Sequence, residues 1–376
     1  MASTRPAAED APAVGFSNDQ MVRPNPMERS ACSGEGQRVI QMLWATVSRF
    51  CMECSPTTIL RILAATLTFE NVAQAEEVRI ESYPSNRLLN EQVLLHIPAR
   101  APTGLLVLMS AGDIHSYNEK SGSTPATLPR LVGTNGVITL VAAARPGMGA
   151  AVGLYAGDAV LEEMDGLIAE VLDKYKIQNG RVAIGGFSAG GIGAMRYAQF
   201  CVKGKRRTKA PVAVFAVDCP LDYERCCLAA ELRLKRLALA GRDNAEDRDA
   251  VYYLRKEFGG SPKEAVEAYR QQSVVSILIP EGGNARLLKD IPVRIFIEPD
   301  IAWRVECWNQ DVYSANIIDA ASLINILRLL GNKNADLITT SGKGYRPDGS
   351  RNPHSWAIVD EPALAEWLQK FLRPSE

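Results

Sequence analysis

A serine between glycines is the first feature of the chain that could do chemistry. The segment Gly186-Phe187-Ser188-Ala189-Gly190 fits the pattern G-x-S-x-G. The apolar run 181–184 before it predicts a strand, and the periodic run 192–201 after it predicts a helix. A serine on such a tight strand-to-helix turn exposes its hydroxyl, and the turn leaves no room for side chains on its neighbours. We therefore predict that Ser188 is a nucleophile rather than part of a plain glycine-rich turn.

A serine hydroxyl needs a base to take its proton, and the chain contains three histidines. His96 lies in a predicted strand, where a structural role is expected. His115 lies in the loop after the apolar run that ends at Met109. His354 lies between the last predicted strand and the C-terminal helix. It is either the base or a loop histidine with a structural hydrogen bond.

The glycines around Ser188, in the segment Gly-Gly-Phe-Ser-Ala-Gly-Gly, resemble the α/β-hydrolase superfamily and its serine-esterase-like branch. The resemblance covers about residues 78–374. It implies the chain order nucleophile, acid, histidine, and His354 is the one histidine that follows Ser188. We therefore predict that His354 is the general base.

The resemblance also implies a carboxylate that holds the histidine in the required tautomer. It should follow the strand before the last, which we place at 292–297. Asp300 is the predicted acid, with Glu298 as the alternative and Asp218, at the end of an earlier strand, as a third candidate. The carboxylate at 298 or 300 that is not the acid would bind a neighbouring site residue or the substrate.

Two backbone N–H groups should stabilise the oxyanion that forms on the substrate carbonyl. The resemblance implies that one belongs to Ala189, the residue after the nucleophile. The other should come from the loop after Met109, where we predict Gly112 or Asp113. This loop departs from the HGGG pattern of many esterases.

Three tryptophans, Trp303, Trp308 and Trp356, lie near the predicted acid and base in the sequence. They would either line an acyl or sugar pocket or pack in the core, and both interpretations stay open.

A glycine-rich run over 147–153 has the spacing G-x-G-x-x-x-G rather than the G-x-G-x-x-G of dinucleotide sites. We predict a substrate-side loop there. The sequence has no Walker-type lysine motif and no metal-ligand cluster, so no cofactor or metal is expected.

Strands and helices are predicted to alternate from about residue 76 onward. Period-two patterns predict a hairpin over 78–83 and 92–97. Short apolar runs predict further strands over 104–109, 137–143, 181–184, 211–217, 292–297 and 336–339. Helical patterns between them cover 124–131, 160–172, 192–201 and 315–330, and a last helix follows His354. This alternation predicts an α/β fold, a mostly parallel sheet with helices on both faces.

Residues 221–290 hold several helical patterns and no convincing strand. We interpret them as a helical cap or lid inserted into a hydrolase domain that covers residues 76–376.

The first 75 residues are predicted to be an N-terminal extension that is disordered over most of 1–50. The apolar run 59–69 and the small residues Ala73 and Ala75 resemble a signal peptide, although Arg61 interrupts the run. A start at Met42 or Met52 would give this segment the usual position. Such a segment would send the chain out of the cytoplasm, whereas an amphipathic helix packed on the domain would leave it there.

Composition excludes some classes of partner. The formal net charge of −1 provides no field for nucleic acid, and the basic run 203–209 is expected to be a solvated loop. No apolar stretch reaches the length of a membrane span. Eight cysteines are present, and Cys219, Cys226, Cys227 and Cys307 could be buried thiols or form disulfides. The oligomeric state stays open.

These features together predict a hydrolase that cleaves a small carboxylic ester through an acyl-enzyme. A prolyl-oligopeptidase-like peptidase would use the same triad, but no propeller-like repeat region precedes the domain. A catalytically inactive binding protein is the alternative outside the enzymes, and it would have no need to keep all three residue types.

Overall fold

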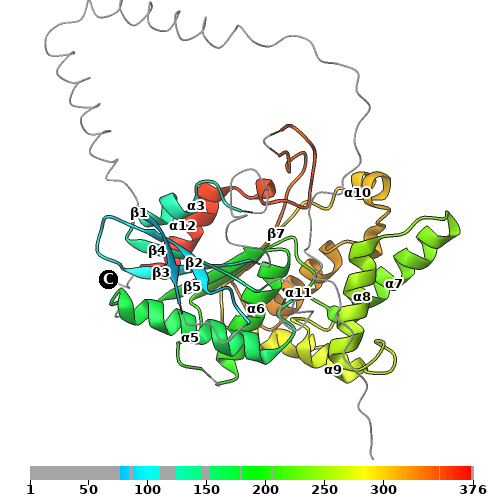
Figure 1. Cartoon of the computed structure of the whole chain (residues 1–376), viewed down its shortest axis with the longest axis horizontal. Coiled ribbons are helices and arrows are strands. Elements are labelled where there is room, and N and C mark those ends of the chain that lie inside the picture. Colours follow the sequence, from blue (N-terminus) through cyan, green and yellow to red (C-terminus); the bar gives the residue numbers. More distant parts are fainter. Residues whose placement is uncertain are drawn as a thin grey trace, which may run out of the picture. The chain divides into compact units, whose positions relative to one another are not determined.

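An eight-stranded, mostly parallel sheet forms the centre of the structure (Figure 1). The computed structural model describes residues 77–83, 88–110, 124–145, 153–177, 180–204, 206–346 and 348–373. The strands are β1 (Glu77–Ser82), β2 (Gln92–Ile97), β3 (Gly104–Ser110), β4 (Val137–Ala143), β5 (Val182–Phe187), β6 (Ala213–Val217), β7 (Val293–Ile297) and β8 (Ala335–Thr339). Their order in the sheet is β1-β2-β4-β3-β5-β6-β7-β8. β2 runs antiparallel to β1 and β4, and the pairs from β4 to β8 are parallel.

Helices connect the strands and cover both faces. The α-helices are α3 (Leu128–Gly133), α5 (Asp158–Lys174), α6 (Ala189–Val202), α7 (Tyr223–Leu239), α8 (Ala245–Phe258), α9 (Val266–Gln272), α10 (Ile301–Trp308), α11 (Ile317–Leu329) and α12 (Glu361–Leu372). Short 3-10 helices are η2 (Gly283–Leu288), η3 (Val312–Ser314) and η4 (Trp356–Ile358). None of the helices in the described ranges is long and apolar enough to cross a membrane.

The apolar core has two parts, one on each face of the sheet. Successive residues of β3 alternate between them: Leu105 and Val107 face one part, and Leu106 and Leu108 face the other. α3 and α12 cover the face of Leu106, whereas α5, α6 and α11 cover the opposite face (Figure 1). The continuous apolar runs of β3 and β4 thus have the pattern of strands buried on both sides, as predicted.

The helical insertion predicted within residues 221–290 is present between β6 and β7 as α7, α8, α9 and η2, and the described residues of this range include no strand. Its beginning is fixed to α11 by Asp319, which accepts hydrogen bonds from the backbone N–H groups of Leu221 (2.8 Å) and Asp222 (3.1 Å). Arg225 of α7 pairs with the same carboxylate, and both side chains are buried. One helix, α10, was not predicted, and it carries groups of the candidate site.

All five cysteines in the described ranges are free thiols: Cys201, Cys219, Cys226, Cys227 and Cys307. The disulfides considered from the sequence for the last four are therefore absent from the structure. The predicted signal segment and N-terminal extension lie outside the described residues.

Candidate active site

Ser188 occupies a strained turn between β5 and α6. Its backbone angles are φ 52° and ψ −123°, in a region that residues with a Cβ rarely adopt. The conformation is held in place because the Ser188 N–H donates to the carbonyl oxygen of Val217 (2.9 Å), and the Ser188 carbonyl accepts from the N–H of Gly191 (2.9 Å). The strand, the tight turn and the helix predicted around the serine are thus all present.

The two glycines of G-x-S-x-G are required by a close approach of the turn to the end of β3. A Cβ on Gly186 would lie 2.6 Å from the carbonyl oxygen of Met109, and one on Gly190 would lie 1.9 Å from the same oxygen. Neither distance is possible between non-bonded atoms, and the obstacle is backbone that cannot rotate away. Glycine at these positions therefore lets the serine turn pack against its neighbouring strand.

His354 lies against the serine. Its Nε2 is 3.2 Å from the Oγ of Ser188, which is hydrogen-bonding distance. The ring lies beside two aromatic rings, Phe187 with centroids 4.6 Å apart and Trp308 at 5.7 Å. Its backbone N–H donates to the side-chain oxygen of Asn352 (3.1 Å), which fixes the loop at this point.

The carboxylate on the far side of the ring is Asp218, at the end of β6. Its Oδ2 lies 3.0 Å from the Nδ1 of His354. The ring N–H is not aligned along this contact well enough for a full hydrogen bond, although the distance is short. Such contacts are often loose in ligand-free hydrolases and tighten when the reaction begins. Three groups distant in the sequence therefore lie in one row.

Asp218 is completely buried, and two further groups hold it. Arg304 of α10 donates from Nη2 to Oδ2 (2.6 Å), and Asn316 donates from Nδ2 to Oδ1 (2.8 Å). Burial alone would raise the pKa of the Asp218 carboxyl, but the positive charges of His354 and Arg304 outweigh it and lower this pKa to about 2. The group is thus a carboxylate at any ordinary pH.

The prediction that Asp300 is the acid needs a correction, because the Asp300 side chain contacts groups other than His354. The Asp300 carboxylate caps α10 by accepting from the N–H of Trp303 (3.2 Å), and it pairs with Arg351 (2.7 Å). The alternative, Glu298, also pairs with Arg351, and it accepts from the hydroxyl of Thr340 (2.9 Å).

These contacts give both carboxylates a shared role. Glu298 also accepts from the N–H of Lys343 (3.0 Å), so the end of β7 binds three points of the segment between β8 and His354. Asp300 and Glu298 therefore anchor the loop that carries the histidine instead of contacting its ring.

The oxyanion-hole residues are only partly described. Ala189 is the first residue of α6, directly after the serine, where backbone N–H groups have no partner within the helix. Gly112, Asp113 and His115 lie outside the described residues.

Two of the three tryptophans lie beside the row of groups, and the third packs in the core. Trp308 contacts His354, and Trp303 packs on Trp308 with centroids 4.9 Å apart, so both border the row of groups. Trp356 is a core residue, because it is buried, meets Phe215 edge-on and donates to Glu361 (2.9 Å).

Sequence reasoning missed Asn316, at the start of α11, and Arg304, which lies on α10. The helix has a signal that could have been read: Asp300 precedes it as an N-cap, and Asn309 ends it in the left-handed conformation. That signal would have assigned Asp300 to the N-cap of α10 instead of the role of the acid. Nothing local indicates that Arg304 points into the interior.

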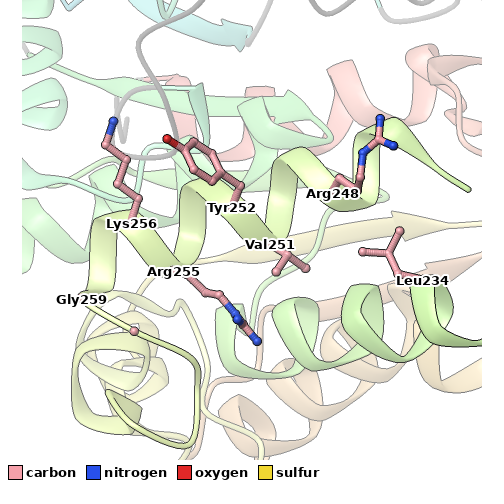
Figure 2. A pocket seen from close by; sticks show the side chains of 8 residues that line it. Leu234, Arg248, Val251, Tyr252, Arg255, Lys256 and Gly259 are labelled. Carbon is pink, nitrogen blue, oxygen red and sulfur yellow. The ribbon is translucent and has the colours of Figure 1, made fainter. Parts of the chain in front are cut away.

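A surface hollow lies apart from this row of groups. A cavity of about 700 Å³ lies between α7 and α8. Leu234, Val251 and Arg255 project into it from the two helices (Figure 2). Arg255 in its wall is ion-paired with Glu231 (2.7 Å). No residue of the cavity belongs to the site around Ser188.

Within the described ranges, no group of three or more histidine, cysteine or acidic side chains is arranged to hold a metal ion. The glycine run 147–153 lies outside these ranges apart from Gly153.

Comparison with known proteins bears on the fold. No family model and no curated protein matches the sequence. The acylaminoacyl peptidase of Pyrococcus horikoshii aligns with a TM-score of 0.52 and 14% identity over 83% of this chain and 44% of that one. This chain thus spans less than half the length of the peptidase. Carboxyl esterase 2 of the fungus Tuber melanosporum aligns with a TM-score of 0.50 and 15% identity over 80% of this chain and 88% of the esterase. The sheet order, the serine turn and these likenesses agree, and the chain has the α/β-hydrolase fold.

Proposed function

We propose that the protein is a serine hydrolase that cleaves a carboxylic ester through an acyl-enzyme, with Ser188 as nucleophile, His354 as general base and Asp218 as acid. The observation that carries the proposal is the contact of 3.2 Å between the Ser188 hydroxyl and His354, on a turn whose strain exposes that hydroxyl. A buried carboxylate on the other ring nitrogen supplies the orienting group that such a base needs.

In the acylation step, Ser188 Oγ attacks the ester carbonyl carbon while its proton passes to Nε2 of His354. The new C–O bond pushes an electron pair onto the carbonyl oxygen, and the N–H of Ala189 donates to that oxyanion. The positive imidazolium is stabilised by Asp218. When the tetrahedral intermediate collapses, the bond to the alcohol breaks and Nε2 returns the proton to the departing oxygen.

In the deacylation step, a water molecule takes the place of the alcohol. His354 removes a proton from the water, whose oxygen attacks the acyl carbon. The bond to Ser188 Oγ then breaks, and the imidazolium protonates that oxygen. The acid product leaves, and the serine, histidine and aspartate are restored. Because the pKa of Asp218 is lowered to about 2, the carboxylate keeps its charge through both steps.

A fluorophosphonate probe tests whether the protein is an enzyme of this class. The wild-type protein should be labelled stoichiometrically, and Ser188→Ala should not be labelled at all. Ser82→Ala, an exposed serine of β1, is the matched control and should be labelled like the wild type. Absence of labelling on the folded wild type would instead favour a binding protein on the same fold.

A second assay separates an esterase from a peptidase. We expect p-nitrophenyl esters of short acyl chains to be hydrolysed and prolyl or acylaminoacyl p-nitroanilides to be left intact. A faster reaction on the anilides would overturn the ester assignment and leave the serine mechanism in place. A panel of acetylated sugars and feruloyl esters then narrows the substrate class.

A further inference from the structure

Asp218 is shared between the histidine and an arginine. A single oxygen, Oδ2, lies 3.0 Å from Nδ1 of His354 and 2.6 Å from Nη2 of Arg304. The mechanism above requires the histidine contact only. Arg304 therefore competes for the charge that would otherwise stabilise the imidazolium.

Arg304 is held rigidly in this position. Only 2% of its side chain is exposed. Its Nη1 donates to Oε1 of Gln310 (3.2 Å), and its guanidinium carbon lies 5.6 Å from the centroid of the Trp308 ring. Trp308 also touches His354, so the arginine and the base share an aromatic neighbour as well as a carboxylate oxygen. A buried cation in fixed geometry keeps its effect on neighbouring charges better than one in solvent.

Several other polar and charged groups near the pair have partners among the described residues. Asn316 holds the second oxygen of Asp218 from the start of α11. Glu298 and Asp300, from β7 and the start of α10, are paired with Arg351. Asp319 of α11 is paired with Arg225 of α7. Ser188 and Phe187, from the β5 side, face the histidine without a charge.

We propose that Arg304 is a positioning residue of the site, which fixes the Asp218 carboxylate and sets the pH at which His354 loses its proton and becomes the base. The inference rests on the proposed function. Because Nη2 and Nδ1 contact the same oxygen, the two nitrogens are less than about 6 Å apart, and a positive charge at that distance opposes protonation of the ring. At an effective dielectric of about 20, removal of the charge moves this pH upward by about 2 units.

The test compares Arg304→Gln, which removes the charge and keeps a donor, with Arg304→Lys, which keeps the charge. Arg248→Gln, at an exposed residue of α8 far from the row of groups in the sequence, is the control. The midpoint of the acid limb of kcat/KM for a p-nitrophenyl ester should rise by about 2 pH units in Arg304→Gln. It should stay close to wild type in Arg304→Lys and Arg248→Gln. An arginine with a purely structural role would lower the rate in Arg304→Gln and leave the midpoint unchanged, and that result would overturn the proposal.

A second variant and a second readout keep the inference testable if Arg304→Gln does not fold. Gln310→Glu places a carboxylate on the other side of the guanidinium and offsets its charge, so it should shift the midpoint in the same direction by a smaller amount. No shift in Gln310→Glu would then refute the role of the charge.

The titration of His354 can also be followed by NMR, because the chain has three histidines and His354→Gln identifies the signal. This readout needs no substrate. Loss of the proposed function, with no labelling of the wild type, is therefore distinguishable from failure of this inference, in which the His354 titration is the same with and without Arg304.

Discussion

Replacement of Asp218 by Asn tests the identity of the acid directly. The carboxylate lies 3.0 Å from Nδ1 of His354, and at an effective dielectric of about 20 an ion pair at this distance is worth about 5 kcal/mol. An asparagine keeps the shape and loses that charge, so the imidazolium formed in the transition state is no longer stabilised. We expect kcat for a p-nitrophenyl ester to fall about 10⁴-fold, which corresponds to about 5 kcal/mol.

Asp300→Asn is the matched control, because the sequence alone favoured that residue. Asparagine is as good an N-cap as aspartate, so α10 should keep its start. Arg351 would lose one of two carboxylates and keep Glu298. The expected loss of activity is less than about tenfold, since the broken ion pair is partly exposed.

Both variants are assayed after near-UV circular dichroism has established that they are folded. The reasoning is refuted if Asp300→Asn loses several orders of magnitude while Asp218→Asn stays within tenfold of the wild type. A comparable loss of activity in both variants would mean that the loop anchored by Asp300 is as necessary for the reaction as the carboxylate of Asp218.

Three further changes have expected outcomes. Gly190→Ala puts a methyl group 1.9 Å from the Met109 carbonyl oxygen, so the free energy of unfolding measured in urea should fall by about 3 kcal/mol, and an unchanged value would contradict the packing argument. Asp319→Asn leaves the buried Arg225 without its charge partner and should cost about 3 to 5 kcal/mol in the same assay, whereas a loss below about 1 kcal/mol would mean that the pair contributes little. The pKa of Asp218 is lowered from 3.8 to about 2, so its carboxylate stabilises the fold above pH 3.8, and this contribution is lost as the pH falls toward 2. Between about pH 4.5 and 2.5 the wild type should lose about 1.5 kcal/mol through this group, a loss that Asp218→Asn should lack when urea unfolding is compared at the two pH values.

The serine turn could be predicted because its signal is local. A strand, a tight turn and a helix follow one another within a short stretch, and glycines mark the positions where side chains do not fit. Most strands and the helices between them could be predicted for a similar reason, since burial on both faces gives continuous apolar runs.

The acid could not be predicted because three carboxylates end or follow parallel strands at the same edge of the sheet. Their distances in the sequence do not tell which one faces the histidine. Asp218 does so because β6 lies directly beside β5, whereas the carboxylates after β7 are taken up by Arg351 and the cap of α10. The burial of Arg304 is a tertiary effect, and a charged residue in a helix gives no local sign of it.

The position of the acid at the end of β6 determines which residue of the site can move away from the other two. Nucleophile and acid sit at the ends of adjacent strands, and the bond from the Ser188 N–H to the Val217 carbonyl ties these ends together. The histidine belongs to the long connection between β8 and α12, fastened at its base by Glu298. The sheet therefore fixes the serine and the aspartate, whereas the histidine lies on a loop that Glu298 anchors. Movement of this loop alone would separate the histidine from the other two residues and stop the reaction, while the sheet stays intact.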